Sequence, residues 1–296
     1  MDDLLNKLYT AANQAAHEHN LEPNVVLNRL PPIDIFVFGR SGIGKSTLIE
    51  AITNEKVYSS ARLDHVTEQL TEITKTIGNL KFRFWDTKGI DNWREGDTFN
   101  LIIQMKDREI KPIFAIYCAA AGGRVDSNVV TLILQYFQLE NIPICYVITN
   151  IYAASIEQFE GQLEGGRSIM STVFNTDDRE IGKFCFEYES VLPGPSDSTV
   201  QTKGILIGVN SCSFSNIMGN TMPPYNIHEL MDFLARNLND EQFTKFVALT
   251  MNNRAFWDRA YDALRSRLLR IKETIIRWDI LPKSFIDAFF KPRQSV

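Results

Sequence analysis

Short apolar runs alternate with amphipathic stretches from residue 33 to residue 238. Apolar runs of this length predict strands, and apolar residues recurring every three or four positions predict helices. Strands are expected at 33–38, 70–77, 80–86, 112–119, 143–149 and 204–209. Helices are expected at 44–54, 97–108, 126–139, 154–173 and 226–238. This alternation predicts an α/β fold with a doubly wound, mainly parallel sheet and helices on both faces.

Two segments depart from the alternation. The strands 70–77 and 80–86 are separated only by the Gly-Asn dipeptide at 78–79, which predicts an antiparallel hairpin. The stretch 175–203 is acidic and contains Pro-Gly-Pro at 193–195, a composition typical of a long surface excursion.

Both ends of the chain have a helical pattern. Residues 2–19 place apolar side chains on one face, and prolines then interrupt the chain before residue 33. From residue 240 onward the pattern is helical only. We therefore expect an N-terminal helix and connector at 1–30, an α/β domain at 31–240 and a C-terminal helical extension at 241–296.

The C-terminal extension carries an apolar stripe flanked by arginines. Alternating spacings of four and three residues place seven side chains on this stripe: Trp257, Tyr261, Leu264, Leu268, Ile271, Ile275 and Trp278. The stripe can dock on the α/β domain, pair with a partner helix or lie on an acidic membrane surface. We favour docking, because Asp258, Asp262 and Glu273 on the same helix would be repelled by an acidic membrane.

Composition and charge narrow the class of protein. Hydrophobic residues make up 44% of the chain and charged residues 23%, which allows a core of normal size. The net charge of −5 argues against nucleic acid as a partner. Residues 242–296 hold 11 basic and 5 acidic side chains, whereas the remainder holds 20 basic and 31 acidic. The four cysteines lack metal-site spacing, and neither a secretory signal nor a membrane-spanning run is visible, so we expect a cytoplasmic protein.

A glycine-rich loop follows the first strand and opens the first helix of the α/β domain. Its glycines permit positive φ and close approach of a phosphate, and the helix start attracts an anion. Lys45 supplies a cation for the β- and γ-phosphates, and the Ser46 hydroxyl is a ligand for Mg²⁺. The predicted phosphate-binding residues are Gly39, Arg40, Ser41, Gly42, Ile43, Gly44, Lys45, Ser46 and Thr47.

A second motif, Asp86-Thr87-Lys88-Gly89, ends the strand at 80–86. With these two motifs in this order, the sequence resembles the translation-factor-related P-loop GTPases over about residues 33–239, and within them the septin-like and immunity-associated group. The resemblance implies GTP or GDP and Mg²⁺ as cofactors. It also implies that Asp86 holds Mg²⁺ through water and that the Gly89 amide senses the γ-phosphate.

The resemblance also implies a threonine that completes the Mg²⁺ shell. Thr67, just ahead of the strand at 70–77, is the candidate, and Thr71 and Thr74 are its rivals within the strand pattern. A solvated loop threonine is the alternative interpretation of Thr67. The metal ligands expected are thus Ser46, Thr67 and Asp86.

The base-reading motif of these GTPases is altered. Thr149 matches the family pattern, but Asn150 replaces its lysine and Tyr152 replaces its aspartate. A phenol cannot supply the two acceptor oxygens of that aspartate. Tyr152 either stacks on a base or packs as a loop aromatic. Asn210 and Ser211, after the strand at 204–209, are the further candidates for contact with the base.

The catalytic set is also altered. Ile90 stands where small GTPases carry a water-positioning glutamine. Lys45, Thr67 and Gly89 remain as catalytic candidates, and Lys88 and Arg40 either offset charge in transfer or are solvated side chains. We expect a Mg²⁺-dependent guanine-nucleotide switch with slow GTP hydrolysis, assisted by a homodimer, an oligomer or another partner. The alternatives are a pseudo-GTPase scaffold that binds nucleotide without turnover and an ATP-using P-loop protein.

Overall fold

The computed structural model describes most of the α/β region and the helices that follow it. The described residues are 32–56, 70–77, 80–87, 95–123, 125–193, 199–215 and 220–277. The expected helix at 2–19 and its connector lie outside them, as do Thr67 and the Lys88-Gly89-Ile90 segment.

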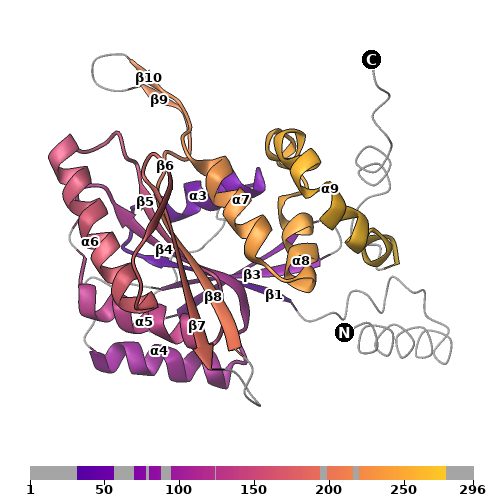
Figure 1. The fold of residues 1–296 in the computed structure, drawn as a ribbon, viewed down its shortest axis with the longest axis horizontal. Coiled ribbons are helices and arrows are strands. Elements are labelled where there is room, and N and C mark those ends of the chain that lie inside the picture. Colours follow the sequence, from indigo (N-terminus) through magenta and orange to yellow (C-terminus); the bar gives the residue numbers. More distant parts are fainter. Residues whose placement is uncertain are drawn as a thin grey trace.

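Eight strands form the main sheet (Figure 1). They are β1 (Ile33–Gly39), β2 (Leu70–Ile77), β3 (Leu80–Thr87), β4 (Pro112–Ala120), β5 (Ile144–Thr149), β6 (Arg179–Gly182), β7 (Cys185–Pro193) and β8 (Thr199–Gly208). Their order is β2-β3-β1-β4-β5-β8-β7-β6. The five strands from β3 to β8 in this order pair in parallel, and β2, β7 and β6 pair antiparallel at the two edges. The carboxyl ends of the parallel strands therefore share one edge of the sheet.

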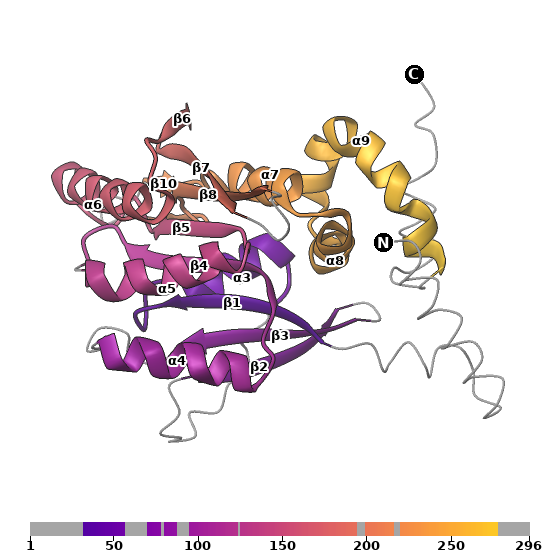
Figure 2. The ribbon, with the colours of Figure 1, turned by 60° about the horizontal axis from the view of Figure 1, so that its bottom comes forward.

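Helices cover both faces of this sheet (Figure 2). On one face lie α4 (Glu95–Asp107), α5 (Ser127–Leu139) and α6 (Ile156–Phe174). The other face carries α3 (Lys45–Thr53), α7 (Ile227–Asn237) and α8 (Asp240–Thr250), and α9 (Arg254–Arg277) packs on α7 and α8. A short hairpin of β9 (Phe214–Ser215) and β10 (Thr221–Met222) projects beyond β8. The predicted α/β class is confirmed.

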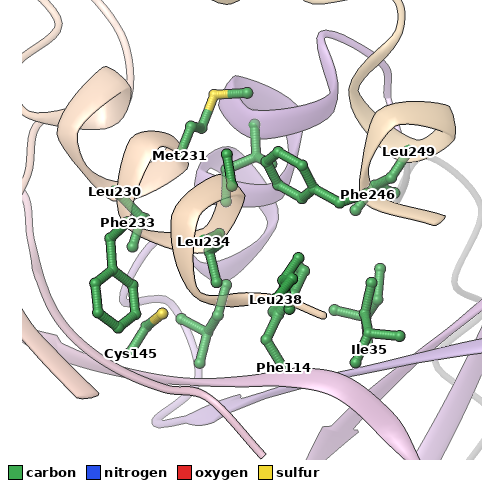
Figure 3. Packing of buried hydrophobic residues seen from close by; sticks show 14 of the residues in the cluster. Ile35, Phe114, Cys145, Leu230, Met231, Phe233, Leu234, Leu238, Phe246 and Leu249 are labelled. Carbon is green, nitrogen blue, oxygen red and sulfur yellow. The ribbon is translucent and has the colours of Figure 1, made fainter. Parts of the chain in front are cut away.

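The central strands are buried on both sides, as expected for parallel strands between two helical layers. Along β1, Ile35 and Val37 join the hydrophobic cluster under α3, α7 and α8, whereas Phe36 and Phe38 join the cluster under α4, α5 and α6. Figure 3 shows part of the first cluster, in which Leu238 and Phe246 lie above the sheet residues Ile35 and Phe114. The rings of Phe114 and Phe246 lie 6.5 Å apart.

The prediction of a surface excursion at 175–203 is wrong. This segment holds β6, β7 and the first residues of β8, which extend the sheet by an antiparallel hairpin. Its charged side chains pair across neighbouring strands, Arg179 with Glu187 and Lys203 with Glu189, and Arg236 of α7 also contacts Glu187. Opposite-charge pairs thus join the strands of this edge hairpin, while the buried Phe186 and Tyr188 alternate with the glutamates along β7.

The C-terminal stripe docks on the body of the molecule. Trp257, Leu264, Leu268 and Ile271 are buried in the same cluster as β1 and α3, and Trp257 is only 2% exposed. The Trp257 indole N–H donates to the carbonyl oxygen of Thr250 at 3.0 Å. Tyr261 is partly buried against this cluster, and Trp278 lies outside the described residues. The docking alternative therefore agrees with the structure as far as Ile271.

Helix α3 is held at its far end by asparagines, here named the asparagine junction (Asn54, Asn252 and Asn253). The Asn253 side-chain amide donates to the carbonyls of Ala51 and Ile52 at 2.9 and 3.0 Å, and its oxygen accepts from the Phe256 amide at 3.2 Å. Asn54 donates to the Asn252 carbonyl at 3.1 Å. One side chain therefore satisfies the last carbonyls of α3 and caps the start of α9.

No helix in the described part of the chain is long and apolar enough to cross a lipid bilayer.

Candidate nucleotide-binding site

The phosphate loop joins the carboxyl end of β1 to the start of α3, as the sequence predicts. Gly39, Gly42 and Gly44 have φ values of 135°, 76° and 98°. At Gly39 a Cβ would lie 2.3 Å from the Cys118 carbonyl oxygen of the neighbouring strand, so no larger residue fits there. Gly44 is the N-cap residue of α3 in the left-handed region, which other residues rarely adopt. The glycines are thus required by the path of the loop.

The start of α3 is free to receive an anion. Its N-cap residue is Gly44, which has no side chain, and among the described residues no side-chain cap hydrogen bond is made there. The first turn contains no acidic residue. Ser46 and Thr47 lie in this first turn and are half-buried. Uncapped amides and the positive end of the helix dipole favour a phosphate group at this position.

Lys45 folds back over the loop. Its ammonium group donates to the carbonyl oxygens of Gly39 at 2.9 Å and Arg40 at 2.8 Å, and it lies 3.4 Å from Oδ1 of Asp86. The side chain is 8% exposed. These contacts fix a positive charge between the end of β1 and the end of β3.

Asp86 is the acidic residue of this site. Burial raises the pKa of its carboxyl from 3.8 to about 6, against the opposing effect of the Lys45 charge and of the Thr87 backbone. Its Oδ1 atom is buried, and apart from the Lys45 ammonium group at 3.4 Å it has no hydrogen-bond partner within the described structure. A buried carboxylate oxygen with unused acceptor capacity next to an anion-binding loop fits a hard cation such as Mg²⁺, which prefers oxygen ligands.

Thr149 anchors the phosphate loop to the end of β5. Its buried hydroxyl is within hydrogen-bond distance of the carbonyl oxygens of Ile43 and Ala119, and it can donate to one of them at a time. Asn150 follows with a φ of 55°, and a Cβ on Gly44 would lie 3.5 Å from its Nδ2 atom. The Asn150 side chain therefore lies beside the phosphate loop and is itself exposed.

Asn210 and Ser211 are both buried just past the end of β8. The Asn210 amide donates to the carbonyl oxygens of Cys212 at 2.8 Å and Pro223 at 2.6 Å. Both amide hydrogens are thus engaged in holding the loop that leads to β9 and β10. The structure thus places Asn210 at the edge of the sheet that holds the carboxyl ends of the parallel strands. Its amide hydrogens bind protein carbonyl oxygens.

Tyr225 also lies at this edge, and no motif in the sequence marks it as a candidate. Its ring centroid lies 6.5 Å from that of Tyr152, at an interplanar angle of 63°. The two tyrosines are 73 residues apart in the sequence and lie in no shared motif. Only the pairing of their loops brings them together.

Comparison with known proteins agrees with this geometry. Residues 34–149, from β1 to β5, match the family described as 50S ribosome-binding GTPase. No curated protein matches the chain significantly. This segment, with its phosphate loop and mostly parallel sheet between helices, has the fold of a P-loop GTPase.

Solved structures with a similar arrangement are distant. Translation elongation factor SelB from Methanococcus maripaludis, in complex with the GTP analogue GppNHp, is 16% identical at a TM-score of 0.32; the match covers 65% of this chain and 46% of that one. Toc33 from Arabidopsis thaliana, in complex with GDP and Mg²⁺, is 15% identical at a TM-score of 0.32, covering 56% and 68%. A dimerization-deficient Toc33 mutant is 14% identical at 0.36, covering 56% and 69%. This chain thus spans less than half the length of the elongation factor.

Proposed function

We propose that this chain is a Mg²⁺-dependent GTP-binding switch that hydrolyses GTP slowly. The observation that carries the proposal is the combination of the uncapped start of α3, the Lys45 ammonium group and the buried Oδ1 atom of Asp86, which faces Lys45 at 3.4 Å. The start of α3 and the Lys45 ammonium group would bind the phosphates of a nucleotide, and Oδ1 of Asp86 would serve the Mg²⁺ that accompanies them. The match of residues 34–149 to a GTPase family supports the same nucleotide class.

The roles of single residues follow from their positions. Lys45, Ser46 and Thr47 would hold the phosphates at the start of α3, with Mg²⁺ bound by Ser46 and Asp86. Bound Mg²⁺ would neutralise the charge that develops on the phosphates during transfer. Thr67, as a third metal ligand, and Gly89, as the γ-phosphate sensor, are part of the proposal and lie outside the described residues.

Slow turnover is proposed because Ile90 cannot orient a water molecule. The isolated chain should hydrolyse GTP at roughly 10⁻⁴–10⁻³ s⁻¹ or less, the scale of unassisted small GTPases. If a second copy of the chain supplies the missing group, turnover per molecule should rise with protein concentration. Initial rates across a dilution series measure this, and a fast rate that is independent of dilution would contradict it.

The second candidate function is a pseudo-GTPase scaffold, and Ile90 is the observation that favours it. The intact Lys45, Ser46 and Asp86 favour the enzyme. A single-turnover assay with GTP prebound to the protein separates them, because the scaffold would release GTP unchanged. A place among the septin-like and immunity-associated GTPases and a cytoplasmic location also belong to the proposal, supported by motif order and composition alone.

Substitution of Lys45 tests nucleotide binding. Lys45→Ala removes the cation that faces the phosphates, so the affinity for Mg²⁺–GTP should fall on the order of 100-fold. Lys81→Ala, on the exposed side of β3, is the matched control and should bind as the unmodified chain does. Titration calorimetry gives the affinities and circular dichroism checks the fold. A folded Lys45→Ala protein with unchanged affinity would refute the proposed function.

A further inference from the structure

Two tyrosines lie near the carboxyl ends of β5 and β8: Tyr152 follows β5, and Tyr225, between β10 and α7, is paired with Asn210 just past β8. Tyr152 is 37% exposed, and its ring meets the half-buried ring of Tyr225 edge to face at 6.5 Å. The two loops are joined, because the Ile151 amide donates to the Val209 carbonyl at 3.3 Å. The pair therefore forms one aromatic surface that spans both loops.

The aromatic surface lies at a distance from the phosphate loop that the sugar and base of a nucleotide would span. In the sheet, β5 and β8 are the second and third strands from β1 on the side of β4. With neighbouring strands about 4.8 Å apart, the end of β5 lies about 10 Å and the end of β8 about 14 Å from the phosphate loop. Asn150, two residues before Tyr152, lies beside Gly44 of that loop. A base attached to phosphates at α3 would extend toward the two tyrosines.

The surface is held in place from behind. Tyr225 exchanges both backbone hydrogen bonds with Asn210, at 3.1 and 2.9 Å. The Asn226 amide donates to the carbonyl oxygens of Lys183 and Gly208, each at 3.0 Å. Phe184 then packs at 6.5 Å from the Tyr225 ring. Aromatic groups fixed in this way bind a planar ligand with little loss of conformational freedom.

These loops contain no carboxylate that could accept hydrogen bonds from the guanine edge and so distinguish guanine from adenine. Residues 150–155 and 209–215 contain no Asp or Glu. The Asn210 amide hydrogens and the Thr149 hydroxyl are engaged with backbone carbonyls. The carboxylate of Asp126, in the preceding loop, accepts from the Val129 amide at 3.3 Å and caps α5. Contact through an aromatic face is tolerant of base identity, because every base has a π-face.

We propose that Tyr152 and Tyr225 form a stacking surface for a purine base, so that the site takes guanine and adenine nucleotides with affinities within about 10-fold of each other. The inference rests on the proposed function, since it requires the phosphates to bind at α3. It adds the ligand class: a purine nucleoside di- or triphosphate, held at its base by aromatic contact rather than by a carboxylate.

The test compares nucleotides with a ligand that has phosphates and no base. Affinities of Mg²⁺–GDP, Mg²⁺–ADP and Mg²⁺–tripolyphosphate are measured by titration calorimetry for the full chain and for Tyr152→Ala, Tyr152→Phe and Lys45→Ala. Tyr152→Ala should lose about 10-fold in affinity for GDP and ADP alike and keep its affinity for tripolyphosphate. Tyr152→Phe retains the aromatic face and should bind all three as the unmodified chain does.

The outcomes separate the two proposals. If Tyr152→Ala binds both nucleotides as tightly as the full chain, or if GDP is preferred over ADP by clearly more than about 10-fold, the stacking surface is refuted while nucleotide binding at the phosphate loop stands. Should Lys45→Ala keep its affinity for tripolyphosphate and GDP, the phosphate site itself is refuted, and the stacking surface with it. Equal losses for GDP, ADP and tripolyphosphate in Tyr152→Ala would show a general disturbance of the loop and would also overturn the inference.

Discussion

The Asp86 carboxyl binds its proton unusually tightly because it is buried. Its pKa of about 6 lies within a range that is easily reached in solution. A protonated carboxyl carries no charge to attract a cation, so Mg²⁺-dependent nucleotide affinity should fall as the pH drops through about 6. Calorimetric titration of Mg²⁺–GDP between about pH 5 and pH 8 measures this dependence.

Asp86→Asn provides the control for this pH dependence. Phosphate groups also titrate near pH 6, and their contribution persists in the variant. Equal pH dependence in both proteins would therefore contradict the assignment to Asp86. In the ligand-free protein, the native carboxyl binds its proton more tightly than the unfolded chain does. The contribution of Asp86 to the free energy of unfolding is therefore greatest below about pH 4 and is lost as the pH rises to about 6.

The structure brings the residues predicted for phosphate binding together more completely than those predicted for contact with a base. The glycines, Lys45 and Asp86 lie in short motifs whose spacing fixes their chemistry, and the structure brings them together. Thr149 was predicted as a base contact, but its hydroxyl anchors the phosphate loop, a role that depends on which carbonyls lie opposite it. Tyr225 could not be found, because its neighbour Tyr152 is brought near only by pairing between distant loops.

The two ends of helix α3 have different tasks. Its first turn offers amides to a ligand, and its last carbonyls are satisfied by Asn253. Asn253→Ala would leave those carbonyls and the start of α9 without partners, at a cost of about 2 kcal/mol in the free energy of unfolding. Urea denaturation measures the change.

Asn253→Asp is the informative companion to this variant. The aspartate keeps an acceptor for the Phe256 amide but turns a second oxygen toward the carbonyls of Ala51 and Ile52. We expect it to destabilise the protein at least as much as alanine does. A stability equal to that of the unmodified chain would show that only the cap of α9 matters.

Element boundaries were predicted well wherever apolar periodicity marks them, as in β1, β4 and β5. Strand β6 was missed because all four of its residues are exposed, and a pattern without a buried face gives no strand signal. Strand β7 was missed because the acidic residues and the Pro-Gly-Pro at 193–195 outweighed its buried alternation of Phe186 and Tyr188. The C-terminal stripe, in contrast, was evident, but its partner surface on α7 and α8 was not.

At the scale of the whole molecule, helix α9 is part of the hydrophobic core. Removing residues 255–296 would uncover the surface that Trp257, Leu264 and Leu268 cover, so the truncated protein should melt at a lower temperature by several degrees or more. Differential scanning calorimetry of both proteins measures this. A truncated protein that melts no lower would refute the docking of α9.

Vesicle binding distinguishes docking from the membrane alternative. If the stripe served an anionic membrane, the full chain would sediment with anionic vesicles, salt would weaken the binding, and the truncated chain would stay in solution. The burial of Trp257 leads us to expect no sedimentation of the full chain.

The asparagine junction also has a consequence for how the site comes into being during translation. The phosphate loop and α3 are complete at residue 53, whereas the side chain that holds the end of α3 belongs to residue 253. The helices α7 and α8, which cover the same face of the sheet, are likewise synthesised late. At ribosomal rates roughly 10–40 s separate the two events. A nascent chain therefore carries the entire phosphate loop well before it carries Asn253, α7 and α8, and a chain that ends prematurely lacks them altogether.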